Sequence, residues 1–559
     1  MIRDLPLQQD AAVKVNFLSL AIGLAAAAAT ISGLWGMLGW QRPVPEPPPG
    51  KVHCVSYTPF CGGDSPFDPL YVADPQQIDA DLRLVSGVSD CIRLYAPDQG
   101  LGAALPLAER FGLKVLLGIW IGRDEIGNEK QIALGVALAK AHRGAVKAVV
   151  VGNEVLLRGE QTAKTMAELA ARVKRETGLP VTYADVTDFW LTAPRELAGA
   201  VDFITIHVLP YWEDEPAAAA RGLDVVRSAV ERVQARFPEK PIFIGETGFP
   251  SRGRERGTAV PSLVSQAFYL RGFAAYAEQS GLDYNLIEAF DQPWKRLLEG
   301  TAGGSWGLFD SARTPKFPWR GPVSNRPEWR IEAAASLGIA ALLLLGWFAA
   351  GRAMSLRRAA FLGCAAGAGA TLLILQIEHS WAASRSIEES IVELLVFAQS
   401  LAALALLPPE LLKGRVAVSP APVAACLDWL RSPRAKPFGR ALGFGLLRLS
   451  VAVSALVVSL CLAFDPRYRD FPIAAFAVPA VAFAGIALVR GEAFARRQNY
   501  REESVLAFLF AVSAAIILVN ETPLNLAADL WGAIELLLLL PWTGALRGLF
   551  VRPAPAPAA

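Results

Sequence analysis

Two glutamates stand at the ends of short apolar runs, where a buried strand would deliver them to a surface. Glu154 ends the run "VVVGNE", and Glu246 ends "FIGE" just before a turn through Gly248 and Pro250. Cleaving the acetal bond between two sugars requires one carboxyl group that is protonated and a second that is ionised. One isolated carboxylate in such a position is as well explained by a salt bridge or a helix cap, but two such positions favour paired acid and base chemistry.

Eight short strand-like runs, separated by helix-like segments, are available to position these glutamates. Strands that alternate with helices predict a parallel sheet, and eight such units in about 270 residues are the size of a TIM barrel. The sequence therefore predicts an α/β fold, a (β/α)8 barrel, with Glu154, Glu246 and also Glu288 at the C-terminal rim of the strands. The predicted strands are residues 52–57, 91–96, 114–120, 146–154, 180–185, 201–208, 241–246 and 283–290.

The two glutamate motifs resemble those of glycoside hydrolase family 17, the β-1,3-glucanase and glucanosyltransferase family. The resemblance extends to "SYTPF" (56–60), "IRLYAPD" (92–98), "LPYWED" (209–214) and "YNLIEAFDQPWK" (284–295), so it covers residues 52–320. It implies that Glu154 is the general acid/base, that Glu246 is the nucleophile, and that Asn153 holds the 2-hydroxyl of the sugar. Phe249 stands where many plant members have Trp, which keeps a ring but loses an indole N–H.

Further side chains near the predicted rim are candidates for binding sugar. Aromatic rings can stack on the apolar face of a sugar, although ordinary barrel packing explains each of them equally well. His207 either reaches the site or is a hydrogen-bonded core residue, and the charged candidates either hold hydroxyl groups or form structural ion pairs. The aromatic candidates are Tyr57, Tyr95, Tyr183, Tyr211, Trp212, Phe249, Trp294 and Trp306, and the charged ones are Arg93, Glu288 and Lys295.

The sequence gives no reason to expect a cofactor, a metal ion or a nucleic-acid partner. Its four histidines and six cysteines form no Cys-x-x-Cys or His-x-x-x-His spacing. The "DAD" at 79–81 imitates the metal motif of nucleotide-sugar transferases, but it lies inside a predicted outer helix, where a solvated face explains it better. An oxidising compartment would permit one disulfide among Cys54, Cys61 and Cys91. Cys54 and Cys91 are the preferred pair because each begins one of two adjacent predicted strands.

Roughly half of the chain is apolar enough to lie in a membrane. Runs of about 20 apolar residues, the length that crosses a bilayer, lie near 17–40, 332–351, 359–377, 389–407, 442–464, 472–489, 503–520 and 529–550. The first run is too long for an ordinary signal-peptide core, which favours an uncleaved anchor over a cleaved signal. The expected organisation is a cytoplasmic tip and anchor helix (1–41), a Pro-rich spacer (42–50), the barrel (51–325), a membrane domain of about seven helices (326–552) and a Pro/Ala tail (553–559).

Lys and Arg residues gather on one side of the predicted spans, which sets their expected orientation. The opposite side holds only Arg385, Arg467 and Arg469 in its short loops. Both termini are therefore expected in the cytoplasm and the barrel in the periplasm of a bacterial inner membrane. The basic flanks contain Arg3, Lys14, Arg352, Arg357, Arg358, Lys413, Arg415, Arg431, Arg434, Lys436, Arg440, Arg490, Arg496, Arg497, Arg501, Arg547 and Arg552.

Ionisable groups within or beside the spans raise the question of what the membrane helices do. They could form one polar pocket that passes glucan, or they could serve interhelical hydrogen bonding and the docking of another protein. The groups are Glu378, His379, Glu389, Glu393, Arg448 and Glu535.

The whole arrangement resembles bacterial membrane proteins of the β-(1→6)-glucan synthase type, which join a family 17 domain to a multi-helix tail. The resulting hypothesis is a retaining glycosidase or transglycosylase that remodels or branches β-glucan, with the bilayer and a separate glucan synthase or exporter as further partners. The alternative is a glucan-binding or export-coupling membrane component without catalysis.

Overall fold

The computed structural model describes residues 5–349, 354–414, 416–432, 438–491, 501–521, 523 and 525–543, and the side chains of all these except 5–16, 501 and 502. The chain forms two compact units. One is Gln41–Asn325, and the other combines Met1–Trp40 with Arg326–Ala559.

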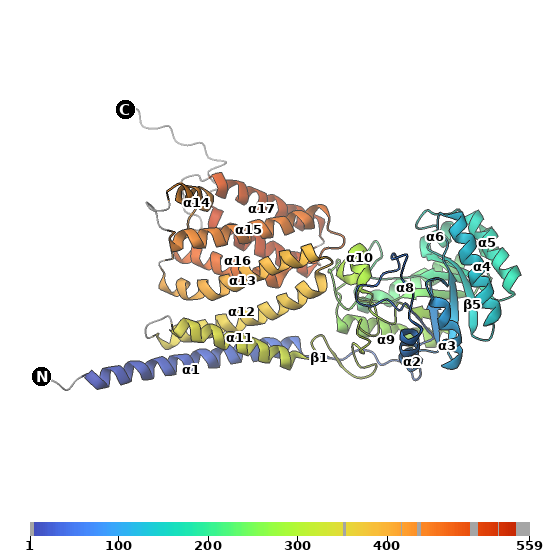
Figure 1. The fold of residues 1–559 in the computed structure, drawn as a ribbon, viewed down its shortest axis with the longest axis horizontal. Coiled ribbons are helices and arrows are strands. Elements are labelled where there is room, and N and C mark those ends of the chain that lie inside the picture. Colours follow the sequence, from blue (N-terminus) through green and yellow to red (C-terminus); the bar gives the residue numbers. More distant parts are fainter. Residues whose placement is uncertain are drawn as a thin grey trace, which may run out of the picture. The chain divides into compact units, whose positions relative to one another are not determined.

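The first unit contains a closed barrel of eight parallel strands, which confirms the predicted fold class (Figure 1). Every predicted strand is present. Seven connections between neighbouring strands follow chain order, and the eighth strand pairs with the first to close the barrel. The strands are β2 (Cys54–Ser56), β3 (Cys91–Leu94), β4 (Lys114–Ile119), β5 (Val146–Asn153), β6 (Val181–Val186), β7 (Ile204–His207), β8 (Ile242–Thr247) and β9 (Asp283–Leu286).

Helices follow the strands and surround the barrel (Figure 1). Four of them begin at a polar side chain that accepts a backbone N–H of the first turn, namely Asp74, Asp124, Thr162 and Ser262. Such caps satisfy donors that a helix cannot pair internally. The helices are α2 (Pro75–Ser86), α3 (Ala104–Arg110), α4 (Glu125–Ala141), α5 (Ala163–Thr177), α6 (Thr187–Thr192), α7 (Arg195–Ala200), α8 (Gly222–Arg236), α9 (Leu263–Ser280) and α10 (Arg296–Gly303).

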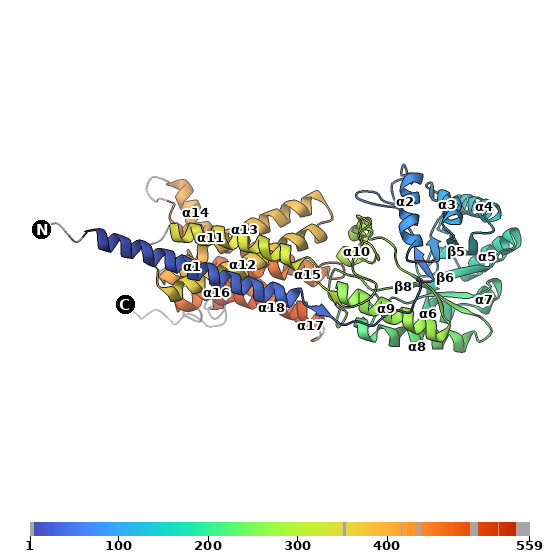
Figure 2. The ribbon, with the colours of Figure 1, turned by 90° about the horizontal axis from the view of Figure 1, so that it is seen from below.

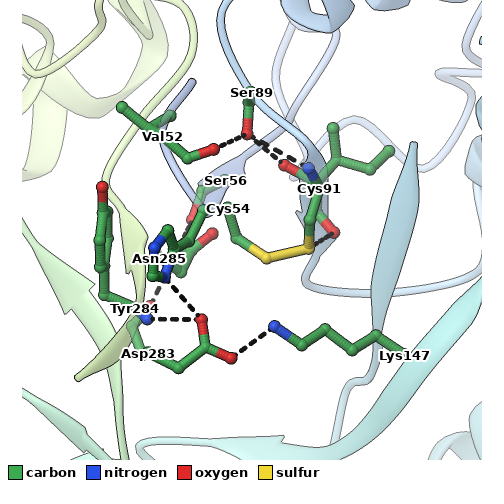
Figure 3. The surroundings of a disulfide bond; sticks show 12 residues. Val52, Cys54, Ser56, Ser89, Cys91, Lys147, Asp283, Tyr284 and Asn285 are labelled. Atoms are coloured by element: carbon green, nitrogen blue, oxygen red, sulfur yellow. Dashed lines mark hydrogen bonds and ion pairs between the residues drawn. A yellow bond between two sulfur atoms is a disulfide. The ribbon is translucent and has the colours of Figure 1, made fainter. Parts of the chain in front are cut away.

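The N-terminal ends of β2 and β3 are joined by a disulfide bond between Cys54 and Cys91 (Figure 3). This is the pair that the sequence favoured. Both cysteines are buried where β2 and β3 begin, on the opposite side of the barrel from Glu154 and Glu246. Nearby, Lys147 donates to Asp283 at 2.5 Å, which links the starts of β5 and β9. This end of the barrel is therefore held by covalent and ionic links between strands.

One expectation about the "DAD" motif is wrong. Asp81 lies on α2 as predicted, but it is fully buried instead of solvated. Arg313 reaches it from a loop far along the chain, with 3.0 Å between Nη2 and Oδ2. A salt bridge from so distant a residue leaves no local signal in the sequence.

The Pro-rich segment after the first helix is packed against the barrel unit. Its first residues form β1 (Gln41–Arg42), which pairs antiparallel with β10 (Val323–Ser324). Glu46 then accepts the Gly321 N–H at 3.0 Å, and Pro47 is buried. The proline content predicted a semi-rigid spacer, and the structure adds that this segment is paired with the barrel unit.

The second unit is a bundle of long apolar helices (Figure 2). Six helices in the described part of the chain are long and apolar enough to cross a membrane, and Ile473–Val489 is a shorter apolar helix. Each of the eight predicted spans overlaps a helix, but α16 and the 14-residue α18 are shorter than the spans predicted there. The ends of the 332–351 and 529–550 spans lie outside the described residues. The helices are α1 (Leu5–Leu38), α11 (Trp329–Ala349), α12 (Leu356–Ala383), α13 (Ile387–Lys413), α14 (Pro422–Arg431), α15 (Arg440–Phe464), α16 (Ile473–Val489), α17 (Arg501–Asn520) and α18 (Leu526–Leu539).

Close contacts between small residues join α1 to α12, and a tryptophan hydrogen bond joins α1 to α11. A Cβ added to Gly363 of α12 would lie 2.2 Å from the Gly23 carbonyl oxygen of α1, so the two backbones touch. Trp35 of α1 donates its indole N–H to Ser336 of α11 at 2.9 Å. The first helix is thus an integral part of the bundle.

Several basic residues used for the orientation prediction lie outside the described residues, as does the tail 553–559. They are Arg3, Arg352, Arg415, Arg434, Lys436, Arg496, Arg497, Arg547 and Arg552.

Candidate active site

The end of β5 turns two consecutive side chains toward the barrel mouth. Successive residues of a regular strand point to opposite faces. Here Gly152 has a φ of 85° and Glu154 a φ of 53°, and the pairing of β5 with β6 shifts register before Asn153. A Cβ on Gly152 would also lie 2.7 Å from Met166, so only glycine fits. The irregularity allows Asn153 and Glu154 to serve the same site.

Glu246 lies on β8 and is held by two donors from β3 and the residue that follows it. Tyr95 donates its hydroxyl to Oε1 of Glu246 at 2.9 Å, and Arg93 donates to the same oxygen at 3.1 Å. Arg93 also donates to the Asn153 side chain at 2.5 Å. Arg93, which is buried, therefore links the end of β5 to the end of β8.

His207, at the end of β7, lies between the two glutamates. Its Nδ1 is 2.7 Å from Oε1 of Glu154, and its Nε2 is 3.6 Å from Oε1 of Glu246. One carboxylate oxygen of each glutamate and one imidazole nitrogen all lie within 4.8 Å of one another. The structure thus brings Glu154, Glu246, Asn153, Arg93, Tyr95 and His207 into one hydrogen-bonded group.

A buried chain of hydrogen bonds supports Tyr95 from inside the barrel. Asn285 of β9 donates to Ser56 of β2 at 2.8 Å, and the Ser56 hydroxyl lies 3.0 Å from the Tyr95 hydroxyl. Because the single proton of Tyr95 goes to Glu246, the Ser56 hydroxyl must donate to Tyr95. Neither Ser56 nor Asn285 was singled out from the sequence, since a small polar residue inside a strand resembles any other barrel filler.

Glu288 and Lys295 form a separate buried ion pair next to this group. Lys295 Nζ lies 3.1 Å from both carboxylate oxygens of Glu288. Burial raises the pKa of Glu288 to about 7, although the charge of Lys295 opposes the shift. Glu246 is among the charges that raise the pKa of Lys295, so the ion pair and the glutamate group influence each other.

The charge state of Glu154 differs from the expectation for a resting proton donor. Burial tends to raise the pKa of Glu154, but the hydrogen bond from His207 and the positive charges of His207, Arg93 and Arg158 outweigh burial and lower it. For Tyr95, burial and the neighbouring Glu246 raise the pKa well above its ordinary value. Tyr95 therefore remains a proton donor to Glu246, whereas Glu154 gives up its proton readily.

Most of the aromatic side chains proposed to stack on sugar are buried and have no exposed ring face. Tyr57 points to Asp81, 3.2 Å away, and Tyr183 donates to Asp185. The structure favours the packing alternative for the five fully or almost fully buried rings, whereas Trp212 and Trp294 are partly exposed. The buried rings are Tyr57, Tyr183, Tyr211, Phe249 and Trp306.

An exposed aromatic ring at the rim, Trp120, was not predicted from the sequence. Trp120 follows β4 directly, and 38% of it is exposed. Arg158 stacks on the ring, with its guanidinium carbon 4.3 Å from the ring centroid, and donates to the Asn153 carbonyl. Trp120 lines a groove of about 430 Å³ together with Asp98, Arg123, Asp124, Lys130 and Gln131. Its place at the end of the run "KVLLGIW" was the available signal.

Glu154, His207 and Glu246 could also offer ligand atoms to a metal ion. Tyr95 and Arg93 already direct protons at Oε1 of Glu246. A metal ion competes poorly for an oxygen that accepts two such donors, so the arrangement suits acid and base chemistry better than metal binding.

Comparison with known proteins places this site in a family. Residues 54–307 match the BtgE/BtgC glycoside hydrolase domain. The match covers the barrel, which is thus similar to glycoside hydrolase domains of this type. The match confirms the resemblance to family 17 for the barrel, whereas the resemblance to bacterial β-(1→6)-glucan synthases remains a prediction.

The glycoside hydrolase domain is also similar to fungal proteins. The glucan 1,3-beta-glucosidase of Candida albicans is 28% identical over 268 residues, which are 44% of this chain and 86% of that protein. The glucan 1,3-beta-glucosidase of Saccharomyces cerevisiae is 24% identical over 263 residues, 43% of this chain and 83% of that protein. Among solved structures, a family 17 beta-1,3-glucanosyltransferase from Rhizomucor miehei has 23% identity and a TM-score of 0.43, and the match covers 48% of this chain and 97% of that one.

Proposed function

We propose that this protein is a retaining glycosidase and transglycosylase that acts on β-1,3-linked glucan. The observation that carries the proposal is the separation of the two glutamates, whose nearest carboxylate oxygens lie within 4.8 Å. Retaining enzymes place their carboxyl groups about 5–5.5 Å apart, whereas inverting enzymes leave roughly 6.5–9.5 Å for a water molecule. The names of the Candida and Saccharomyces relatives support glucan with 1,3-linkages as the substrate.

In the first step, Glu246 attacks the anomeric carbon and the bond to the leaving sugar breaks. The hydrogen bonds to the Glu246 side chain within the described residues all go to Oε1. This leaves Oε2 as the attacking oxygen. Glu154 gives its proton to the departing oxygen, so the products are a glycosyl ester on Glu246 and a shorter glucan with a free hydroxyl group.

In the second step, Glu154 acts as a base. It takes a proton from water or from a sugar hydroxyl, whose oxygen attacks the anomeric carbon and releases Glu246. Glu154 suits both steps because its side chain is 23% exposed, against 7% for Glu246. Asn153, fixed by Arg93, is placed to hold the sugar 2-hydroxyl.

Transfer to a sugar competes with hydrolysis according to how tightly the acceptor is bound. Trp120, Trp212 and Trp294 keep exposed ring surface, and Trp120 borders a largely apolar groove whose lining also includes polar side chains such as Asp98 and Gln131. We infer that these rings bind sugar units beyond the bond that is cut. His207, Glu288 and Lys295 are the remaining polar candidates for substrate contact.

The proposal also includes the cellular compartment in which the barrel acts. The six apolar helices support a membrane protein, and the basic flanks favour both termini in the cytoplasm and the barrel in the periplasm. An enzyme held where a cell exports glucan would remodel or branch that polymer, in company with a separate synthase or exporter.

The test is to incubate the purified full chain in detergent with β-1,3-gluco-oligosaccharides and to analyse early products by mass and linkage. Chains longer than the substrate, or newly linked, are the expected result. Trp120→Ala should reduce these long products, whereas Ile126→Ala, an exposed neighbour on α4 outside the groove, should not. Products that are only shorter would leave a hydrolase, and no products at all would favour a glucan-binding component.

A further inference from the structure

Most of the ionisable groups in the described part of the helical unit are paired individually. Glu378 pairs with Arg326, Glu389 with Arg385, and Arg448 with Glu503. Glu393 accepts a hydrogen bond from Ser380 at 2.6 Å. Most of the groups that the sequence suggested as a common pocket thus have partners of their own, and Glu535 needs a separate explanation.

Glu535 lies on α18 inside the bundle and is only 1% exposed. Its Oε1 is 2.9 Å from the Ser513 hydroxyl of α17. The Ser459 hydroxyl of α15 is a second hydrogen-bonding group beside the carboxyl group, although Oε2 itself makes no well-aligned hydrogen bond among the described residues. One turn earlier on α18, Trp531 donates to Ser459 of α15 at 3.2 Å. The carboxyl group is therefore enclosed where three helices meet.

No positive charge faces Glu535 among the described residues. The neighbouring α16 contains no ionisable side chain. On α17, the described Glu503 is already paired with Arg448 of α15, at 3.1 Å. On α18 itself, Asp529 is exposed. Glu503 and Glu535 are thus two carboxyl groups of one bundle, both buried, of which only the first has a cation beside it.

An ionised carboxylate enclosed without a cation is strongly disfavoured, and such a group takes up a proton instead. We propose that Glu535 is a proton-binding site of the helical unit, with Ser513 as the hydrogen-bonding partner of the bound proton. The geometry accommodates this proton well. Ser513 has one proton and two acceptors in reach, Glu535 at 2.9 Å and the Phe510 carbonyl at 3.2 Å.

The direction of the Ser513 hydrogen bond depends on whether Glu535 is protonated or ionised. When Glu535 carries the proton on Oε1, it donates to the Ser513 oxygen, and Ser513 donates to Phe510. When the proton leaves, Ser513 must turn its own proton to the carboxylate, and the Phe510 carbonyl loses the Ser513 hydroxyl as a donor. Proton binding at Glu535 is therefore linked to the contact between α17 and α18.

Infrared difference spectroscopy of the full chain in detergent tests this assignment. A neutral carboxyl group has a carbonyl stretching band that a carboxylate lacks, and the band shifts when its proton exchanges for deuterium. Glu288, whose pKa is about 7, contributes a band of the same kind at neutral pH. We therefore expect the wild-type spectrum minus the Glu535→Gln spectrum to show the loss of one carboxyl component. Asp529→Asn, on the same helix but exposed, is the matched control and should keep the band.

A second variant keeps the test decisive if Glu535→Gln fails to fold. Ser513→Ala removes the acceptor of the bound proton, so the band should remain but move to the frequency of a carboxyl group without that hydrogen bond. A folded Glu535→Gln variant with an unchanged band overturns the proposal, and so does a Ser513→Ala variant whose band does not move. Loss of the wild-type band in sodium but not in potassium buffer would assign a metal cation to the site instead.

Discussion

At the scale of single residues, the two glutamates are bound into one hydrogen-bonded group. Arg93 reaches Glu246 and Asn153, and His207 reaches Glu154 and Glu246. A change at one position therefore alters the charge state of the others. The sharpest experiments preserve shape and change only one chemical property.

Replacing Glu246 by Gln should abolish turnover, because the amide keeps the shape but cannot form the glycosyl ester. We expect kcat on gluco-oligosaccharides to fall by more than about a thousandfold, with an unchanged far-ultraviolet circular dichroism spectrum. Glu154→Ala should instead slow mainly substrates whose leaving groups need protonation, and azide should restore turnover of those that do not. Wild-type activity in Glu246→Gln would rule out this nucleophile.

The position of His207 predicts an effect on the pH profile. The acid form of Glu154 is required for the first step, and its pKa lies below the usual value. Activity should therefore be highest at acidic pH and fall as the pH rises through that pKa. His207→Ala removes the hydrogen bond and the charge that lower the pKa, so the falling limb of the kcat profile should move to higher pH.

The control for His207 is His53→Ala, which changes a histidine paired with Asp283 at the start of β9. Its pH profile should match that of the wild type. A His207→Ala profile that falls at the same pH, at whatever reduced rate, would show that His207 does not set the pKa of Glu154.

Some site residues could be predicted from the sequence and others could not. Glu154 and Glu246 end apolar runs, so a strand had to carry them to the rim. The burial of Tyr57 and Tyr183 could not be predicted, because a strand position does not reveal which ring points inward. Ser56 and Asn285 are 229 residues apart in the chain, yet the Asn285 side-chain nitrogen lies 2.8 Å from the Ser56 hydroxyl. A contact over that separation leaves no local pattern in the sequence.

At the scale of elements, the two ends of the barrel have different roles, because one end carries the cross-link between strands and the other carries the two glutamates. The N-terminal ends of β2 and β3 carry the disulfide (Figure 3). The two glutamates lie at the other ends of their strands, Glu154 directly after β5 and Glu246 near the end of β8. This division is typical of TIM barrels, whose active sites lie at the C-terminal face.

Removing the disulfide should lower stability without changing the chemistry. Cys54 and Cys91 are 37 residues apart, and a cross-link closing a loop of that length contributes about 4 kcal/mol in the chain-entropy description. We expect the Cys54→Ala, Cys91→Ala double variant to unfold at a lower denaturant concentration while kcat in native buffer stays within a few-fold of wild type. Cys61→Ala, which removes an unpaired cysteine, is the control.

The strands and apolar helices were predictable because each depends on a local pattern of apolar residues. The packing of residues 42–50 was not, since proline content describes only local stiffness. The pairing of Gln41 with Ser324 joins residues nearly 300 positions apart, and the burial of Asp81 likewise depends on the distant Arg313.

At the scale of the whole molecule, the apolar helices and the barrel imply two different surroundings. Reporter fusions after Arg358 and Gly439 should behave as cytoplasmic, and fusions within 51–325 or after Leu526 as periplasmic. A fusion after Arg497, which lies outside the described residues, should also be cytoplasmic. The basic flanks are the physical reason. A cytoplasmic signal from within the barrel would overturn both the orientation and the proposed compartment.

The pairing of β1 with β10 brings the entry and the exit of the barrel unit side by side, at Gln41 and Ser324. The preceding and following helices, α1 and α11, are themselves joined by Trp35 and Ser336. In architectural terms, the enzyme is an insert in a helical hairpin. Excising the barrel between Trp40 and Arg326 would remove the β1–β10 pairing but not the contact of Trp35 with Ser336.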